Sequence, residues 1–331
     1  MSGSSNRTPP HGGVMVVFIL VLTQMLFAAS ARAGAGRPQA PGFYRLTLGA
    51  FEVTALSDGV GPLPVAQLLK GAAPFEIQRL LARERLSDPL PTSVNAFLID
   101  TGSKLILVDA GTGHLRGPAL GQLLVNLGAA GYRPEQIDEI YLTHLHGDHV
   151  GGLSSDGHPL FAHAMVWVAK AEADYWLNPG TMRAAPPDTR APFQQAVDSL
   201  QPYQDAGRLR TFEGHKQLQP GIRALPSAGH TPGHVSYVVE SQGEKLVIWG
   251  DLIHVGAVQF ARPEITIQFD SDPKAAEGRR REALQHAADG GYWIAGAHLP
   301  FPGCGHVSTQ GAGYQWIPAQ YGVSYTPASV H

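Results

Sequence analysis

This sequence is best interpreted from one loop, Thr143-His144-Leu145-His146-Gly147-Asp148-His149. The loop carries three imidazoles and one carboxylate, and it directly follows the apolar run of residues 137–142. Imidazole nitrogens and carboxylate oxygens are donors that borderline divalent ions accept, and without a cation their crowding would leave lone pairs and charge unpaired. Because the apolar run is typical of a strand that could hold the loop rigidly, the stretch predicts a metal site rather than a polar surface turn.

The composition is that of a folded, globular protein. The chain has 331 residues, of which 44% are hydrophobic, so it can bury a substantial core. The formal net charge is -3 and there is no run of Lys and Arg, so we expect neither nucleic acid nor an anionic membrane as a partner. The expected partner is a small-molecule substrate, and a homodimer is an open alternative to a monomer.

The N-terminus has the pattern of an export signal. Arg7 and a polar stretch precede the apolar run of residues 14–29, which is followed by the small-x-small triplet Ala31-Arg32-Ala33. This pattern predicts a signal peptide over residues 1–33, a mature domain over residues 34–331, and a periplasmic or secreted protein without membrane attachment after cleavage. A retained membrane anchor is the alternative, although the run is shorter than the ~20 apolar residues that a span prefers.

Strand and helix patterns alternate along the mature chain, which indicates an α/β fold in a single domain. Residues 65–86 have a helical pattern interrupted by Gly71 and Pro74, and residues 184–192 form a Pro-rich connection. Helices are expected at residues 120–130 and 171–177. Strands are expected at residues 44–48, 51–56, 95–100, 104–109, 137–142, 165–168, 222–225, 235–239 and 246–249.

Further candidate ligands follow other strand-like runs. His230 lies in Gly229-His230-Thr231-Pro232-Gly233-His234, Asp251 follows Trp249-Gly250, and His298 follows Gly296-Ala297. Loops at the ends of strands in a rigid sheet are places where separated side chains can converge, so a distributed site is plausible. Taken singly, each of these residues would more often be a turn residue or a satisfied core group.

Together, His144-x-His146-x-Asp148-His149, His230, Asp251 and His298 resemble the metallo-β-lactamase superfamily, and within it the methyl parathion hydrolases. The similarity runs over nearly the whole mature chain and includes residues 51–59, 229–234 and 298–303. It implies an α/β fold arranged as an αβ/βα sandwich, and a metal-dependent hydrolase. The combined motif is specific for the fold and the metal chemistry and much less specific for the substrate.

The resemblance also implies a binuclear centre with two divalent metal ions, for which zinc is expected while manganese, cobalt and iron are alternatives. One ion would be bound by His144, His146 and His230, the other by Asp148, His149 and His298, and Asp251 would bridge them. Metal-bound hydroxide would then be the nucleophile, so Asp148 and Asp251 are the catalytic candidates and no serine or cysteine is needed.

Two more residues near the motif receive supporting roles. Asp109 ends a strand where the resembling family has a carboxylate that orients a ligand histidine, although a strand-end turn residue is the alternative. His234 is interpreted as a structural, hydrogen-bonding histidine of its turn. The remaining histidines, including His114 and His306, are more typical of surface or core groups.

Two departures from the methyl parathion hydrolases bear on the substrate. This chain has His114-Leu115-Arg116 where they carry an aromatic residue, and His254 where they carry an aliphatic one. Trp176 and Phe193 are candidates for an apolar pocket wall, with core packing as the alternative. Since both departures add polarity, we expect a lactone or aryl ester as substrate. A phosphotriester is second, and a periplasmic β-lactamase or a non-catalytic metal-binding protein are further alternatives.

Overall fold

The computed structural model describes residues 1–3 and 40–322, and the folded unit considered below is residues 41–322. The predicted signal peptide lies outside the described residues from residue 4 onward. Among the described residues, no helix combines the length and apolar character needed to cross a membrane.

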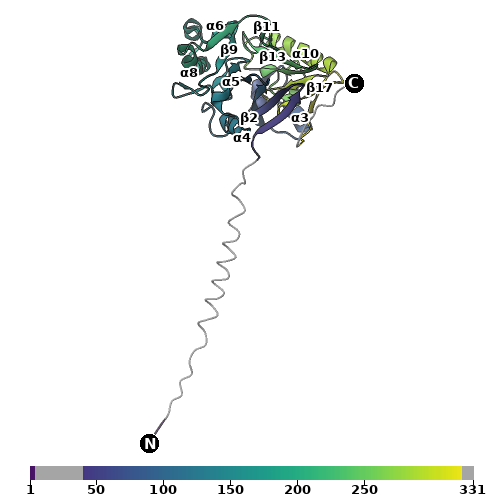
Figure 1. Cartoon of the computed structure of the whole chain (residues 1–331). Helices are drawn as coiled ribbons and strands as arrows, with labels where there is room; N and C mark the ends of the chain where they lie inside the picture. Colours follow the sequence, from purple (N-terminus) through teal and green to yellow (C-terminus); the bar gives the residue numbers. More distant parts are fainter. Residues whose placement is uncertain (4–39, 323–331) are drawn as a thin grey trace. The chain divides into compact units, whose positions relative to one another are not determined.

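Two seven-stranded sheets form the centre of the fold (Figure 1). The first has the order β1-β2-β4-β5-β6-β9-β10 and the second the order β11-β12-β13-β14-β16-β17-β18. The first sheet comprises β1 (Phe43–Leu48), β2 (Phe51–Leu63), β4 (Leu90–Asp100), β5 (Leu105–Val108), β6 (Glu139–Tyr141), β9 (Met165–Ala169) and β10 (Leu209–Phe212). The second comprises β11 (Lys216–Gln219), β12 (Ile222–Pro226), β13 (Val235–Ser241), β14 (Glu244–Ile248), β16 (Trp293–Ala295), β17 (Cys304–Gln310) and β18 (Gly313–Pro318).

Strand direction changes within each sheet. In the first, β1, β2, β4 and β5 pair antiparallel, whereas β5, β6, β9 and β10 run parallel. In the second, only the β14 and β16 pair is parallel among the described strands. Parallel neighbours require crossover connections, so helices and long loops gather at the ends of β5, β6, β14 and β16.

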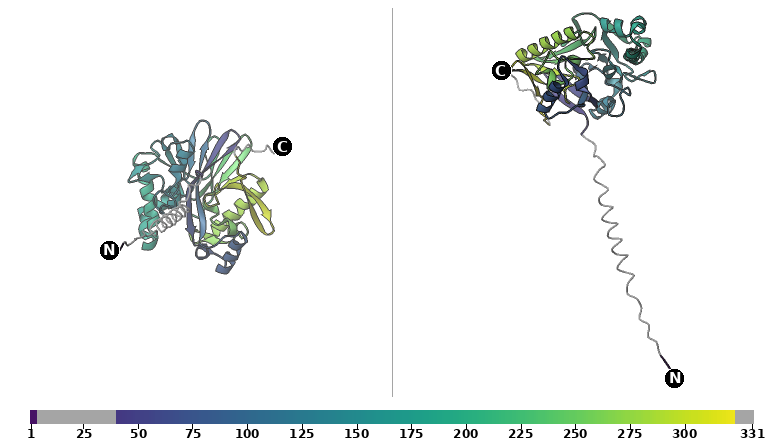
Figure 2. Two further views of the ribbon diagram at one scale, coloured as in Figure 1. Left: turned by 90° about the horizontal axis from the view of Figure 1, so that it is seen from below. Right: turned by 180° about the vertical axis from the view of Figure 1, so that it is seen from behind.

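Helices cover the outer face of each sheet (Figure 2). The helices are α2 (Val65–Leu68), α3 (Pro74–Arg83), α4 (Leu123–Ala129), α5 (Gly147–Val150), α6 (Lys170–Trp176), α7 (Pro179–Ala184), α8 (Ala191–Asp205), α9 (Gly256–Gln259) and α10 (Pro273–Gly290). Short two-stranded sheets pair β3 (Leu69–Lys70) with β15 (Thr266–Ile267), and β7 (Ser154–Ser155) with β8 (His158–Pro159).

The packing of strand β2 illustrates the layers. Val53 and Ala55 belong to a core cluster that also contains Tyr237 and Ile248 of the second sheet, so this face is buried between the two sheets. Leu56, whose side chain is on the opposite face of the strand, belongs to a separate cluster with residues of α4 and α8. Alternate residues of a strand point to opposite faces, so this pattern places helices outside and two sheets inside. The predicted αβ/βα sandwich is confirmed.

Most of the predicted elements are present, but two long helices, strands β10 and β11, and the last hairpin were not predicted. The Pro-rich connection leads directly into α8, where Pro192 occupies the first helical turn, a position that favours proline. Helix α10 is capped at its N-terminus by Asp272, whose side chain accepts a hydrogen bond from the backbone N–H of Ala275. The buried positions of α10 include small alanines and Arg280, so the apolar periodicity of this helix is weak. The capping residue Asp272 was the better sequence signal for the start of the helix.

Candidate metal centre

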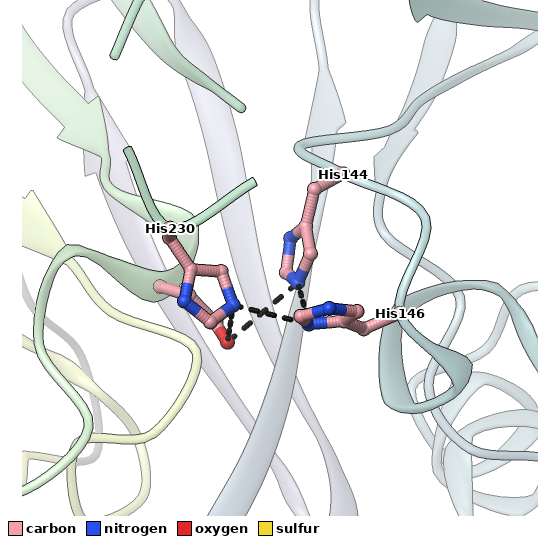
Figure 3. Close-up of side chains that lie close together, drawn as sticks. His144, His146 and His230 are labelled. Carbon is pink, nitrogen blue, oxygen red and sulfur yellow. Dashed lines mark hydrogen bonds and ion pairs between the residues drawn. The ribbon is translucent and has the colours of Figure 1, made fainter. Parts of the chain in front are cut away.

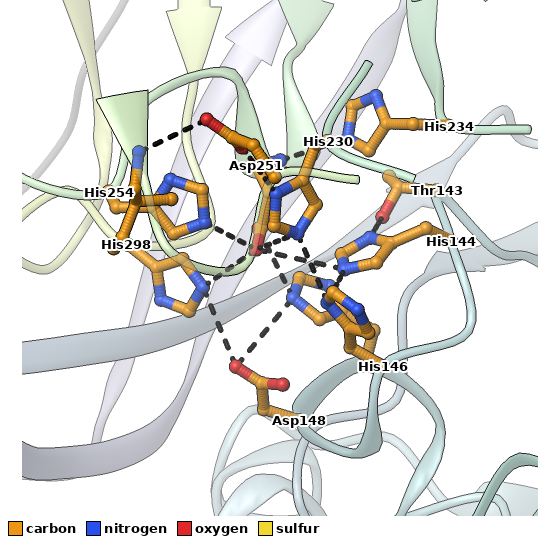
Figure 4. A network of polar contacts seen from close by, with 12 residues as sticks. Thr143, His144, His146, Asp148, His230, His234, Asp251, His254 and His298 are labelled. Carbon is orange, nitrogen blue, oxygen red and sulfur yellow. Dashed lines mark hydrogen bonds and ion pairs between the residues drawn. The ribbon is translucent and has the colours of Figure 1, made fainter. Parts of the chain in front are cut away.

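The seven predicted site residues come from four loops, each following a strand. His144 and His146 follow β6, and Asp148 and His149 lie in the short helix α5 that continues this loop. The other three residues follow β12, β14 and β16 and are His230, Asp251 and His298. The fold brings the donor atoms of all seven together. Figure 4 shows side chains from these separate loops pointing toward one another.

One group contains three histidines with ring nitrogens that face one another (Figure 3). His146 Nδ1 lies 3.0 Å from His144 Nε2 and 3.0 Å from His230 Nε2. The Oδ2 atom of Asp251 lies 3.3 Å from His230 Nε2 and 3.7 Å from His144 Nε2. These four side chains form a compact group that could hold one metal ion.

A second group adjoins the first. Asp148 Oδ2 lies 3.5 Å from His298 Nε2 and 3.8 Å from His149 Nε2. Asp251 also contacts this group, with Oδ1 3.2 Å from His149 Nε2 and Oδ2 3.2 Å from His298 Nε2. A single buried carboxylate therefore lies between the two groups.

Hydrogen bonds on the far side of four of the rings determine which nitrogen faces the centre. His149 Nδ1 lies 2.8 Å from Asp109 Oδ2, and a carboxylate can only accept, so Nδ1 carries the proton. Thr143 donates its hydroxyl proton to Asp109 at 2.8 Å, so its Oγ1 can accept from His144 Nδ1 at 3.1 Å. A neutral ring protonated at Nδ1 presents a bare lone pair at Nε2.

The same arrangement recurs on the other side of the centre. His230 Nδ1 donates to Asp270 Oδ1 at 2.9 Å, and His298 Nδ1 donates to the backbone carbonyl of Ser93 at 2.9 Å. Partners of this kind fix the tautomer and ring orientation of histidines that bind metals. Nε2 of His230 and of His298 is thereby directed at the centre.

A divalent cation fits this set of donors. Ring nitrogens of three histidines lie 3.0 Å apart around His146 Nδ1, and His149 Nε2 and Asp251 Oδ1 are buried without a hydrogen-bond partner. A buried polar atom without a partner is costly, and a cation would satisfy several of these atoms at once. Imidazole nitrogens with carboxylate oxygens are the donors typical of zinc and similar ions.

The electrostatics support ionised carboxylates at the centre. Burial by itself raises the pKa of Asp251, but the neighbouring His298 and His149 outweigh it and hold that pKa well below its usual range. Burial likewise opposes the shift at Asp148, where His149 and His298 lower the pKa to about 2. Burial lowers the pKa of His144 well below its usual value, so this ring is neutral. Ionised carboxylates and a neutral imidazole are the forms that bind metal.

Three other imidazoles, those of His149, His230 and His298, have pKa values that are raised rather than lowered. Burial lowers the pKa of His230, but Asp251 and Asp270 outweigh it and raise the value to about 9. Nearby carboxylates, Asp251 first among them, also raise the pKa of His149 and His298 against burial. A metal ion would displace these protons, so its binding would release protons to solvent.

Glu172 joins the loop of residues 143–149 to the loop of residues 229–234, and it was not predicted from sequence. Its fully buried carboxylate accepts hydrogen bonds from the backbone N–H groups of Leu145 at 3.0 Å and Gly233 at 2.8 Å. Burial raises the pKa of Glu172, and these hydrogen bonds oppose the shift. The only sequence signal would have been an acidic residue in the first turn of α6.

His234 has the structural role expected of it. Its Nε2 accepts the backbone N–H of Asp251 at 3.0 Å, and its Nδ1 lies 2.8 Å from the hydroxyl of Ser227. Burial lowers the pKa of His234 to about 3, so the ring is neutral and Nδ1 donates to Ser227. His234 therefore holds the backbone of Asp251 in place.

A cavity of about 350 Å³ opens onto the centre. Arg116 and His254, which the sequence indicated as relevant to the substrate, both line it. Much of its remaining wall is apolar and includes Leu63, Val94, Leu120, Pro192 and Phe269.

Trp176 and Phe193 are absent from this wall. Both are buried in the core under the helices, with ring centroids 4.6 Å apart, so core packing is the correct interpretation. The Trp176 ring packs edge-on against the ring of His146, with centroids 5.2 Å apart.

Comparisons with known proteins agree with this geometry. Residues 89–298 match the metallo-beta-lactamase superfamily. The crystal structure of the hydrolase AbOPH, in the beta lactamase superfamily, superposes on this chain with a TM-score of 0.83 and 39% sequence identity. The alignment covers 86% of this chain and 100% of the AbOPH chain. AidC, a dizinc quorum-quenching lactonase solved with N-hexanoyl-L-homoserine as product, is 28% identical and covers 85% of this chain and 98% of its own, with a TM-score of 0.78.

One curated relative is a probable metallo-hydrolase of Mycobacterium tuberculosis. It is 26% identical over 214 residues, which are 59% of this chain and 67% of the relative.

Proposed function

Because the chain belongs to the metallo-beta-lactamase superfamily, whose members of this fold are metal-dependent hydrolases, we propose that it hydrolyses a lactone with the aid of two divalent metal ions. The observation that carries this proposal is the position of Asp251. Its two carboxylate oxygens contact both histidine groups, at the base of a cavity large enough for a small substrate.

The protein groups divide into two sets. We assign His144, His146 and His230 to one ion and Asp148, His149 and His298 to the other, with Asp251 shared. Two adjacent cations, when bound, lower the pKa of water and polarise a carbonyl or phosphoryl oxygen. The chain itself orients the donors: Asp109, Asp270 and the Ser93 carbonyl each fix one histidine ring. For zinc as the metal, the donor set and the dizinc centre of AidC are the support.

The choice of a lactone rests on the similarity to AidC and on the cavity. An acyl chain would pack against Leu63, Val94 and Phe269, while the ring carbonyl would point to the metal-facing side chains at the base. Arg116 adds a positively charged guanidinium to the cavity wall, and this group can donate hydrogen bonds to an amide or ester oxygen of the substrate. An aryl ester is a second member of the same substrate class.

A phosphotriester is the alternative substrate, since a binuclear metal site also suits phosphoryl transfer to water. The resemblance to methyl parathion hydrolases supports it, whereas Arg116 and His254 make the cavity more polar than a nitroaryl ester prefers. A β-lactam substrate and a metal-binding protein without turnover are less favoured, because no observation singles out either.

A substrate panel on protein of measured metal content tests the proposal. Initial rates should be compared for N-acyl homoserine lactones, aryl esters, phosphotriesters and β-lactams. We expect the highest kcat/KM for a lactone. A higher kcat/KM for phosphotriesters would establish the alternative, and no turnover of any substrate by the protein loaded with two ions would contradict the proposal.

A further inference from the structure

His254 lies beside the centre but is outside the seven assigned side chains. Its Nε2 lies 3.1 Å from Asp251 Oδ2, and Figure 4 shows the ring turned toward that carboxylate. The ring stacks on His298 at a centroid distance of 5.4 Å and an interplanar angle of 19°, and its centroid is 4.7 Å from that of His230. The imidazole is thus as close to Asp251 as are the assigned histidines.

Nδ1 of His254 has no polar partner, and Nε2 contacts only the carboxylate of Asp251, although the residue is only 3% exposed. Neither Nδ1 nor Nε2 makes a hydrogen bond. Buried polar atoms are almost always satisfied, so an unsatisfied pair at a site of this kind indicates a missing ligand. Asp251, His254 and His298 also form a group whose donor atoms are close enough to share one ion.

The backbone around His254 is held firmly. Its N–H and that of Val255 both donate to the side-chain oxygen of Gln259, at 2.8 Å and 3.0 Å. Gln259 is fully buried and donates in turn to the carbonyl of Ile265 at 3.0 Å. A backbone fixed in this way can hold the imidazole against Asp251, as preorganised donors require.

We propose that His254 is an eighth donor of the metal centre and binds the ion on the side of His298. This inference rests on the proposed function, because it assumes that the centre holds metal. An additional imidazole favours nitrogen-preferring ions such as zinc and cobalt over manganese, which favours oxygen donors. His254 would therefore raise the affinity of the second ion and its selectivity for zinc over manganese.

Metal binding by two variants tests this directly. His254→Asn removes the imidazole, and His254→Phe keeps an aromatic ring that can stack on His298 but has no nitrogen. His286→Asn is the matched control, because His286 is an exposed histidine of α10 outside the groups that could hold an ion. Metal-free proteins are titrated with Co²⁺ and Zn²⁺ against a chelator, and Mn²⁺ competition and the visible Co²⁺ spectrum are recorded.

We expect both His254 variants to bind the second ion about tenfold or more weakly, with a changed Co²⁺ spectrum and a smaller preference for zinc over manganese. The control should match the wild type. Unchanged affinity and spectrum in a folded variant would overturn the inference, even if KM changed. In that case His254 would contact substrate rather than metal.

A measurement on the unaltered protein guards against variants that fail to fold. With ¹⁵N-histidine and ¹¹³Cd²⁺, the His254 ring should show a metal-bound nitrogen, and its absence would contradict the inference. If the wild type hydrolyses lactones with two ions while these tests fail, only the role of His254 is wrong. If the wild type binds no metal, the proposed function itself is wrong.

Discussion

The carboxylate of Asp109 accepts a hydrogen bond from Nδ1 of His149, at 2.8 Å. The same carboxylate accepts the backbone N–H and the hydroxyl of Thr143, each at 2.8 Å, so it holds both ends of the loop of residues 143–149. Asp109 adopts a φ of 60°, a left-handed conformation unusual for a residue other than glycine. Asp109 directly follows β5, and in this backbone conformation its carboxylate makes all three hydrogen bonds.

The first prediction concerns this contact. Asp109→Asn replaces one carboxylate oxygen by an amide NH₂ group, so the side chain can no longer accept all three hydrogen bonds, which are divided between Oδ1 and Oδ2. We expect the metal affinity to fall roughly 10–100-fold, as for other residues that orient a ligand histidine. Competition with a chelator measures the change. Asp289→Asn, at an exposed position of α10, is the control, and equal affinities in the two variants would contradict the orienting role.

The second prediction concerns metal removal. Purified protein should contain two ions per chain, because two groups of donors share Asp251. Chelation should abolish hydrolysis and lower the melting temperature, since a ligand that binds only the folded state stabilises it. Elemental analysis, rate measurement and calorimetry provide the readouts, and added zinc should restore all of them. Full activity in metal-free protein would exclude the proposed chemistry.

The third prediction compares Asp251 with His234. Asp251→Ala removes the carboxylate shared by both groups and should eliminate nearly all activity and at least one ion. His234→Ala frees the backbone of Asp251 and the hydroxyl of Ser227 but removes no side chain assigned to an ion, so we expect a smaller loss of roughly 10–100-fold in kcat. Activity and metal content are measured together on each variant. Equal, mild losses would argue against a shared role for Asp251.

The fourth prediction concerns substrate preference. Arg116 lines the cavity with a guanidinium that stays charged, which disfavours burial of a nitroaryl group against it. Arg116→Phe should raise kcat/KM for a phosphotriester relative to a lactone. Each tenfold change in this ratio corresponds to about 1.4 kcal/mol of differential transition-state stabilisation. An unchanged or reversed ratio at intact metal content would show that Arg116 does not set the preference.

The fifth prediction concerns stability. Glu172→Ala leaves the N–H groups of Leu145 and Gly233 buried without an acceptor, so we expect the free energy of unfolding to fall by about 2 kcal/mol or more. Glu172→Gln keeps one acceptor oxygen and should cost less. Denaturant unfolding of the metal-free proteins measures both. A larger loss in the Gln variant than in the Ala variant would contradict this account.

The sequence predicted the fold correctly, and it also singled out the seven side chains that the structure brings close together. Strand alternation such as that of residues 51–56 reflects burial on one face, a local property that a short stretch of sequence carries by itself. The loop of residues 143–149 was equally recognisable, because metal chemistry demands a particular set of donors and here four of them lie close together in the chain. Helix α10 was missed because small alanines and a buried arginine replace the usual large apolar residues on its inner face.

The tertiary structure alone decided how these side chains act together. Asp270 and the Ser93 carbonyl orient His230 and His298 across 40 and 205 residues of chain, and no local pattern marks such partners. Glu172 and His254 look in sequence like ordinary charged and polar residues. Folding buries both side chains, and a buried carboxylate must find N–H donors while a buried imidazole must find a partner.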